Sequence, residues 1–520
     1  MGVSVSYPGV YIEEMPSGQH TITGVATSIA AFIGWSNKGP VGEALMVESW
    51  AEYQATFGGM IPGVYLGYSV YQFFLNGGQL AYIVRLVDPA TALTASSTIG
   101  NLPLYAANPG AWGNSVYVTI TNVVTVGTVT TFNLQVTQQN PDGTFTTLES
   151  YTNLSTSPTA SQYALTVIDN DSNYITFVPP GGTAPTSVPA PTAGGVTATA
   201  LNGGSGTVVT GADGNMLAPS PAGTSTFETQ LGSAQGYQVL SALAFNILCV
   251  PGETSSKVVP ALEAFCNTSR AILIVDADQS ANGTSSTGLA KTGPADAGGT
   301  TLYNNNSINA AFYYPWVLAA DPMVGNRPTL FPPSGFVAGM FAATDASRGV
   351  WKAPAGIGTA LTGALGLQTN LTDLQQGFLN QLAVNCLRQF PNFGTVIWGS
   401  RTIAGSDALG SQWKHIPIRR LALFIESSLY QGTQWAVFEP NSEPLWGQVR
   451  LSIGTFMQGL FLQGAFAGST PQQAYFVKCD DENNPDSSVA LGILNITVGF
   501  APLYPAEFVI IQIQQMINQS

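Results

Sequence analysis

Side chains able to do chemistry are scarce in this chain of 520 residues, which contains only two histidines, His20 and His415. A Ser-His-Asp arrangement would have to be built around His415, because His20 lies in an N-terminal arm. Lys414, Arg419 and Arg420 are close neighbours of His415 in the sequence and would disfavour its protonation. The sequence therefore predicts no catalytic histidine.

Two carboxylates follow an apolar run that is typical of a buried strand. Asp276 and Asp278 occupy a position that is common for catalytic carboxylates in α/β sheets. The favoured alternative is that they cap the strand end or the next turn. The acidic run 480–484 lacks the spacing of an EF-hand and predicts a solvated turn. With no phosphate-binding GxxxxGK[ST] motif and no GxSxG motif, we expect no enzymatic activity, cofactor or metal.

The four cysteines show neither CxxC nor zinc-site spacing, and each lies in or beside an apolar run. We therefore expect buried free thiols rather than disulfides. The N-terminal residues lack the basic and apolar regions of a signal peptide. No apolar run reaches the roughly 18 residues that span a bilayer. These features predict a protein made in a cytoplasm, without direct membrane insertion.

Only 8% of the residues are charged and 45% are hydrophobic, whereas about 25% charged residues are usual. A large, weakly charged surface favours contact with partners, the alternative being a β-rich protein with polar, uncharged loops. No lysine or arginine occurs between Arg85 and Lys257. Because nucleic-acid surfaces need clustered cations, we expect no nucleic-acid partner.

The residues before position 115 and after position 235 mix helix and strand patterns. The expected strands are Gly9–Glu13, Ile29–Gly34, Ala81–Val87, Ala244–Val250, Ala271–Asp276 and Thr395–Arg401. The expected helices lie around Tyr68–Leu75, at Lys257–Thr268 and over 371–393.

Between these parts the sequence is rich in Thr and Val and predicts an inserted β-domain. Its expected strands are Val116–Val126, Thr130–Gln138, Ala164–Asp169 and Tyr174–Val178. Residues 179–226 are rich in Gly, Pro, Ala, Thr and Ser, which indicates long surface loops or a mobile segment.

The stretch Trp435–Gln515 carries the most specific pattern. Asn441 or Ser442 can cap a helix that Gly464 ends, and Ala474–Cys479 alternates as a strand. This stretch resembles the C-terminal domain of contractile tail sheath proteins of bacteriophages and related injection machines. Further segments similar to that family follow in order: Ser6–Glu14, Phe32–Gly34, Phe73–Gly78, Ala81–Arg85, Asn108–Asn114, Phe312–Trp316, Pro332–Gly335, Asp345–Pro354, Leu382–Arg388, Trp398–Thr402 and Trp413–Leu421.

The resemblance and the patterns together predict a mixed α/β protein, with a multi-domain α+β core, an inserted all-β outer domain and extended terminal arms. The expected divisions are an N-terminal arm at 1–22, a discontinuous α/β domain at 23–114 and 236–340, an inserted β-domain at 115–235, a C-terminal domain at 341–505 and a C-terminal arm at 506–520.

The resemblance implies a structural subunit that polymerises helically around an inner tube and contracts to drive that tube through a cell envelope. The implied partners are further copies in stacked, hexameric rings, the inner tail tube protein, and baseplate and tail-terminator proteins. The implied location is a virion tail assembled in the bacterial host cytoplasm. A phage-tail-like bacteriocin or a non-phage injection system remains an alternative, and a surface-layer or adhesin-type protein a remote one.

In such sheaths the terminal arms add strands to the sheets of neighbouring subunits, a form of β-augmentation. The resemblance therefore assigns strand exchange to Val10, Tyr11, Ile12, Val509, Ile511 and Ile513. Alternatively, both terminal strands complete the sheet of their own subunit. The C-terminal domain is expected to face the tube, with Lys414, Arg419 and Arg420 as tube contacts. The alternative is that these cations pair with local carboxylates or with helix C-terminal carbonyls.

Overall fold

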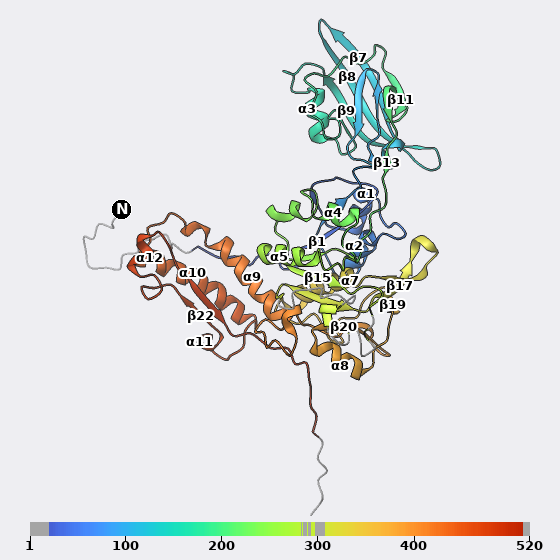
Figure 1. Ribbon diagram of the computed structural model, residues 1–520. Helices are drawn as coiled ribbons and strands as arrows, with labels where there is room; N and C mark the ends of the chain where they lie inside the picture. The colour runs from blue at the N-terminus through green and yellow to red at the C-terminus, as the bar shows by residue number, and fades with distance from the viewer. Residues whose placement is uncertain (1–19, 282, 284–288, 290–292, 297–306, 513–520) are drawn as a thin grey trace, which may run out of the picture. The chain divides into compact units, whose positions relative to one another are not determined.

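The computed structural model describes residues 20–281, 283, 289, 293–296 and 307–512 (Figure 1). The chain forms two compact units. The first, here the sheet unit, comprises Ser28–Thr344 and Pro354–Lys414. The second, here the terminal unit, combines Met1–Thr27, Asp345–Ala353 and His415–Ser520. The expected N-terminal strand Gly9–Glu13, with Val10, Tyr11 and Ile12, lies outside the described residues, as does Ile513.

An eight-stranded sheet organises the sheet unit. Its six inner strands are parallel, and an antiparallel strand flanks them at each edge. The inner strands read as continuous apolar runs because helices cover both faces of a parallel sheet. In spatial order the strands are β2 (Ala44–Val47), β3 (Ala81–Leu86), β1 (Ala30–Trp35), β14 (Ile247–Cys249), β15 (Ile272–Asp276), β16 (Ala310–Tyr314), β20 (Val384–Phe390) and β21 (Gly394–Ile397).

Helices pack against this sheet, and a smaller sheet of three strands accompanies it. The helices are α1 (Trp50–Phe57), α2 (Tyr65–Leu75), α4 (Thr226–Leu231), α5 (Val259–Ser269), α7 (Ser334–Arg348) and α8 (Asp373–Gln381). The smaller sheet has the order β18 (Arg327–Phe331), β17 (Val317–Asp321) and β19 (Ala364–Leu367).

The prediction of one helix over 371–393 is wrong in its second half. A capping box formed by Thr372 and Gln375 starts α8, but the helix ends at Gln381. Ala383 then has a left-handed φ of +65°, and β20 pairs with β16. Tertiary pairing prevails because β20 lies deep in the sheet, where its first four residues are buried.

The inserted β-domain consists of two four-stranded sheets that share one hydrophobic core. The first sheet has the order β11 (Val196–Ala200), β7 (Val116–Val126), β8 (Val129–Gln139) and β9 (Phe145–Ser155). The second has the order β10 (Ile175–Thr176), β6 (Leu102–Ala106), β5 (Ser96–Ile99) and β12 (Ser205–Val209).

Two local predictions in this domain are wrong. The expected strand Ala164–Asp169 lies in a helix, α3 (Ala164–Asp171), because Ala164 and Ile168 are buried at a spacing of four residues. The expected loop region 179–226 contains β11, β12 and the short strand β13 (Ala212–Asp213). Val196 and Leu201 contact the domain core from this region, and that contact stabilises structure in a low-complexity sequence.

The limits of the β-domain also differ from 115–235. Strands β5 and β6 lie before position 115, yet Ile99, Leu102 and Leu104 belong to the same core as β7 and β8. The chain enters and leaves through β4 (Ala92–Leu93) and β13, which pair with each other. After β13 it returns to the main sheet, where α4 packs on β1 and β3.

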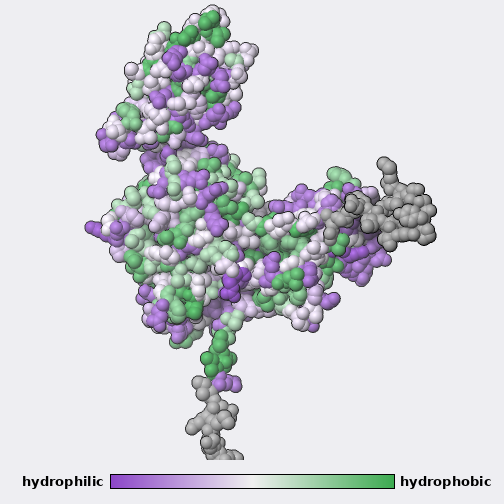
Figure 2. All heavy atoms as spheres, turned by 180° about the vertical axis from the view of Figure 1, so that it is seen from behind, coloured by the Kyte–Doolittle hydropathy of each residue, from purple (hydrophilic) through white to green (hydrophobic). Residues whose placement is uncertain are grey.

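The terminal unit is built on two long helices and a two-stranded sheet. Its elements are α9 (Ile416–Gly432), α10 (Glu443–Leu462), α11 (Pro471–Ala474), β22 (Tyr475–Lys478), α12 (Asp486–Ala490) and β23 (Thr497–Phe500). Ser442 is the N-cap residue of α10 and Gly464 follows its end with a φ of +78°, as predicted. The apolar C-terminal segment leaves this unit as extended chain (Figures 1 and 2).

Candidate interaction surfaces and an occupied crevice

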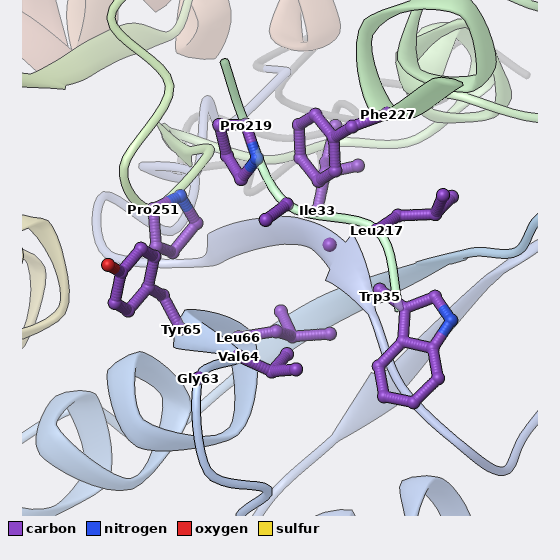
Figure 3. A pocket seen from close by; sticks show the side chains of 12 residues that line it. Ile33, Trp35, Gly63, Val64, Tyr65, Leu66, Leu217, Pro219, Phe227 and Pro251 are labelled. Atoms are coloured by element: carbon purple, nitrogen blue, oxygen red, sulfur yellow. The ribbon is translucent and has the colours of Figure 1, made fainter. Parts of the chain in front are cut away.

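A small apolar crevice lies at the point where the strand order reverses, between β1 and β14 (Figure 3). Doubly wound sheets bind their ligands at this switch point, beyond the carboxyl ends of the strands. Here the wall consists of the end of β1 (Ile33–Trp35), the start of α2 (Gly63–Leu66), Pro251, and a segment returning from the β-domain, with Leu217, Pro219 and Phe227.

The returning segment fills the crevice. Phe227 and Pro219 lie over Ile33, and Tyr65 lies beside Pro251 (Figure 3). Phe227 is 2% exposed. The sequence analysis missed Phe227, although Ser225 and Glu228 form a capping box that marks the start of α4. The place where an α/β enzyme would hold a ligand is thus packed with the chain's own side chains.

The two carboxylates after β15 have structural roles, as the sequence favoured. Asp276 accepts hydrogen bonds from the backbone N–H of Gly252 at 2.9 Å and from Ser334 N–H and Oγ–H at 2.8 Å each. These bonds join the turn after β14 to the start of α7. Burial raises the pKa of Asp276 to about 6, against the effect of these hydrogen bonds. Asp278 accepts from Ser280 N–H at 2.7 Å, which forms the next turn.

The remaining candidates for chemistry are also structural. All four cysteines are free and buried, as predicted, and burial raises the pKa of the Cys386 thiol to about 12. The run 480–484 forms a hydrogen-bonded turn in which Asp480 accepts from Glu482 N–H at 3.1 Å. Among the described residues, no group of three metal-binding side chains is found, and no helix has the length and apolar character needed to cross a membrane.

Each of the three proposed tube-contact cations pairs with a local carboxylate. Lys414 lies 2.7 Å from Asp407, and Arg419 lies 3.0 Å from Glu426. Burial acts to raise the pKa of Asp407, but the Lys414 hydrogen bond and the Arg401 charge outweigh it and lower that pKa.

Arg420 is the most deeply embedded of the three cations. Its guanidinium lies 2.6 Å from Asp345, and both side chains are only 3% exposed. Arg419 and Arg420 belong to the terminal unit, whereas Lys414 is the last residue of the sheet unit. The structure therefore gives all three cations the local partners that the alternative expected.

The two-stranded sheet of the terminal unit is incomplete as it stands. Strands β22 and β23 pair only with each other among the strands described. Their inner residues Tyr475, Val477, Val498 and Phe500 pack on the unit's core but are only partly buried. The outer edges of such a pair carry backbone N–H and C=O groups to which a further strand can bind.

The C-terminal segment offers the complementary feature. Residues 503–512 form no strand, so the part of the predicted strand Val509–Ile513 that is described, Val509–Gln512, is extended chain without a strand partner. Phe508, Val509, Ile510 and Ile511 are each between 75% and 84% exposed. Four consecutive apolar residues at this exposure form an unpaired edge that natural proteins normally cover.

Comparison with known proteins shows similarity to tail sheath proteins. A family model for the phage tail sheath protein central domain matches residues 233–403. The tail sheath protein of Vibrio phage KVP40 is 25% identical over 165 residues, which are 32% of this chain and 23% of that protein. A prophage major tail sheath protein of Pseudomonas aeruginosa is 25% identical over 269 residues, which are 50% of this chain and 62% of that protein. The chain thus matches less than two thirds of the length of either relative.

Solved structures share the fold over nearly the whole chain. The sheath of an extracellular contractile injection system in the contracted state has a TM-score of 0.56 at 23% identity, covering 100% of both chains. The contracted helical sheath of the anti-feeding prophage has a TM-score of 0.57 at 22% identity, covering 99% of this chain and 100% of that one. The sheath tail protein of Listeria innocua has a TM-score of 0.61 at 13% identity, covering 93% and 96%.

The central-domain match includes the strands from β14 to β21, and the curated relatives are tail sheath proteins. Over residues 233–403 the chain thus matches the central domain of phage tail sheath proteins, and it is similar in sequence to tail sheath proteins of a phage and a prophage.

Proposed function

We propose that this protein is the structural subunit of a contractile sheath, which polymerises helically around an inner tube and contracts to drive the tube through a target cell envelope. The observation that carries the proposal is that one subunit has both a two-stranded sheet, β22–β23, and a separate exposed apolar segment, Phe508–Ile511. A strand donor and a strand acceptor on one subunit give head-to-tail contacts, which produce open helical assemblies when the rotation does not close.

The exchange residues in this proposal are Val509, Ile511 and Ile513 at the C-terminus and Val10, Tyr11 and Ile12 at the N-terminus. Alternation of side chains along a strand would place Val509, Ile511 and Ile513 on one face, toward the partly buried inner face of β22–β23. Backbone hydrogen bonds would supply the affinity, and these apolar side chains would fix the register.

The proposed subunit works mechanically rather than by catalysis. Two packings of the same subunits, one metastable and one lower in energy, would supply the work of contraction without a nucleotide. The filled switch-point crevice and the structural hydrogen bonds of Asp276 support this interpretation.

The proposed partners are other copies of the chain in stacked, hexameric rings, the inner tail tube, and the baseplate and tail-terminator proteins, with no nucleic acid. A chain in the baseplate structure of the anti-feeding prophage shares the fold at 21% identity, which supports the baseplate part. The proposed location is a virion tail assembled in the bacterial host cytoplasm. A phage-tail-like bacteriocin or an injection system is the alternative, since both phage and injection-system sheaths are among the relatives.

The C-terminal part of the core, expected at 341–505, is proposed to face the tube, with Lys414, Arg419 and Arg420 as contacts. Because Arg420 is buried against Asp345, charge reversal there would unfold the protein instead of testing the contact. The variant Lys414→Gln removes the charge of this cation and leaves Asp407 paired with Arg401, 2.9 Å away. It should weaken tube attachment while thermal unfolding stays unchanged. Unaltered tube binding would remove Lys414 from the contact.

The test of polymerisation replaces Val509 and Ile511 with aspartate in the full-length protein. Charges on the donor strand cannot enter an apolar acceptor face without a large desolvation cost. The variant should remain a folded monomer by circular dichroism and form no tubes in the electron microscope. Gln512→Asp, next to the same segment, is the control and should polymerise. Tubes formed by the double variant would overturn the strand-exchange proposal.

A further inference from the structure

The N-terminal segment His20–Thr27 lies along helix α9, in the opposite direction to the helix. At one end, Arg420 Nη2 donates a hydrogen bond to the carbonyl oxygen of Thr27 at 2.9 Å. Further along, the Val25 N–H donates to Ser428 Oγ at 3.2 Å. At the far end, the ring of His20 stacks on that of Trp435, with centroids 3.8 Å apart.

The contacts on the helix side form one stripe. Arg420, Phe424, Ser428 and Gly432 are spaced four residues apart, so they lie on the same face of α9. Arg420 is held from its other side by Asp345. Ser428 is completely buried. We call these four residues the α9 stripe.

Two glycines make the close approach between segment and helix. A Cβ on Gly24 would lie 2.8 Å from the Phe424 ring, and a Cβ on Gly432 would lie 2.6 Å from the Ile22 side chain. Real Cβ atoms do not come so near other heavy atoms, so neither position accommodates a side chain without a shift. One glycine is on the segment and faces a helix side chain, and the other is on the helix and faces a segment side chain.

The C-terminal segment is held at the opposite end of the same helix. His415, the residue before α9, packs edge-on against Tyr504 with ring centroids 6.1 Å apart. Its Nδ1 lies 3.6 Å from the Glu507 carboxylate. At 1.5 Å per residue, the 17 residues of α9 span about 25 Å between this site and Gly432.

We propose that α9 is the strut that joins the two intersubunit links of each subunit, an inference that rests on the proposed sheath function. Tension on the N-terminal arm would enter α9 through the stripe, pass along the helix, and leave at His415 into the C-terminal arm. Without the stripe, the same tension would follow the backbone beyond Thr27 into the sheet unit. The stripe thus bypasses the sheet unit during contraction.

The core of the terminal unit stiffens this strut. Leu421 and Ile425 of α9 are buried in the same cluster as Val449 and Ile453 of α10. A helix braced in this way resists bending, because bending would open a close-packed interior. The strut therefore fixes the distance between successive links while the lattice changes its packing.

A reversible lock tests the strut. In the double variant Ile22→Cys with Gly432→Cys, the two Cβ positions are 3.0 Å apart before any shift. A disulfide needs about 3.5–4.5 Å between its Cβ atoms, so the segment and the helix must move apart by about 0.5 Å for the bond to form. The four native cysteines are buried, so oxidation is directed to the new pair. In its reduced form, the variant lacks the contact that Ile22 makes with α9. In its oxidised form, a disulfide joins the N-terminal segment to α9 at the same place.

The assay is electron microscopy of sheaths assembled on their tube and then triggered to contract. Reduced sheaths should break on contraction, and oxidised sheaths should contract intact. The matched control is Gly454→Ala on α10, where an added Cβ meets nothing within 4 Å, and it should behave as the wild type. A second variant, Tyr504→Ala, weakens the opposite end of the strut and should cause the same breakage.

Two outcomes separate this inference from the proposed function. If the wild-type protein forms no sheath, the proposed function fails and the strut fails with it. If the wild-type sheath contracts, and the reduced variant is folded and contracts equally intact, the strut alone is wrong. Thermal unfolding first shows whether monomers of the reduced double-cysteine variant are folded. If they are unfolded, the variant Ser428→Ala, which removes the hydrogen bond from Val25 N–H, is used in place of the double-cysteine variant.

Discussion

Single residues show how burial, rather than chemistry, shapes the ionisable groups of this protein. Glu253 is 2% exposed, and its Oε2 atom has no hydrogen-bond partner among the described residues. Burial raises the pKa of Glu253 to about 8, and the charge of Glu228 acts in the same direction, while hydrogen bonding from Ser255 N–H opposes them. At neutral pH the folded protein therefore holds a proton on a buried carboxyl group.

This proton makes stability depend on pH. An unfolded glutamate has a pKa of about 4.3, so between that value and 8 the folded state binds more protons than the unfolded state. The stabilisation that protonated Glu253 contributes to the folded state is complete below the pKa of the unfolded glutamate. It is lost as the pH rises through the pKa of Glu253 in the folded protein. We predict that the urea concentration at which half of the sheet unit is unfolded decreases as the pH is raised from 5 to 8.

The variant Glu253→Gln is neutral at every pH and should show a smaller fall than the wild type. Burial also raises the pKa of Glu263 to about 7, so part of the slope will remain in this variant. Glu43→Gln, at an exposed residue, is the control and should keep the full slope. Equal slopes in Glu253→Gln and the wild type would show that Glu253 is ionised in the folded protein.

At the scale of elements, apolar runs and caps were sufficient to predict some structures, and tertiary contacts decided the others. The strand of residues 271–276 and helix α10 are where the sequence predicted them, because one is buried on both faces and the other has clear end signals. The residues from Ala164 onward fit both the two-residue period of a strand and the 3.6-residue period of a helix. The burial of Ile168 favours the helix. Thr27 and Arg420 are in contact although they are 393 positions apart in the sequence, and no local sequence pattern predicts this contact.

The β-domain gives the clearest prediction at this scale. Leu93 and Ala212 are direct partners in the β4–β13 pair, so residues 94–211 can be replaced by Asn-Gly, which favours a two-residue hairpin turn. We expect this variant to be soluble and folded, with a lower unfolding temperature because the buried Arg85 loses the Pro109 carbonyl oxygen that accepts from its Nη1 at 2.9 Å. If the domain lies outside the lattice, as the sequence suggested, the variant also polymerises and contracts.

The control is the excision of 115–235, the limits expected from the sequence. It leaves Ile99, Leu102 and Leu104 without the core that covers them. It also removes Phe227 and Leu231, which are buried in the sheet unit. Exposure of this much apolar surface should cause aggregation. If both excisions give equally stable proteins, the limits at β4 and β13 are wrong; if the hairpin variant folds but does not polymerise, the domain belongs to the lattice.

For the whole molecule, the central claim is that subunits are linked by strands that pass from one copy to the next. The ordered motifs made the family recognisable, and the matching central domain and sheath relatives support that identification. The sequence showed two apolar ends, but it did not show that β22 and β23 pair with no third strand among the residues that the structure describes. That feature depends on the pairing of residues that are 19 to 25 positions apart in the sequence.

The most direct measurement is a cryo-electron microscopy reconstruction of the polymer formed by the wild-type protein. The account predicts that residues 508–512 of one subunit form a strand hydrogen-bonded to β22 or β23 of its neighbour. It also predicts that His20–Thr27 remains on the α9 stripe of its own subunit. A polymer in which residues 508–512 pair within their own subunit, or a protein that forms no polymer at all, would contradict the account.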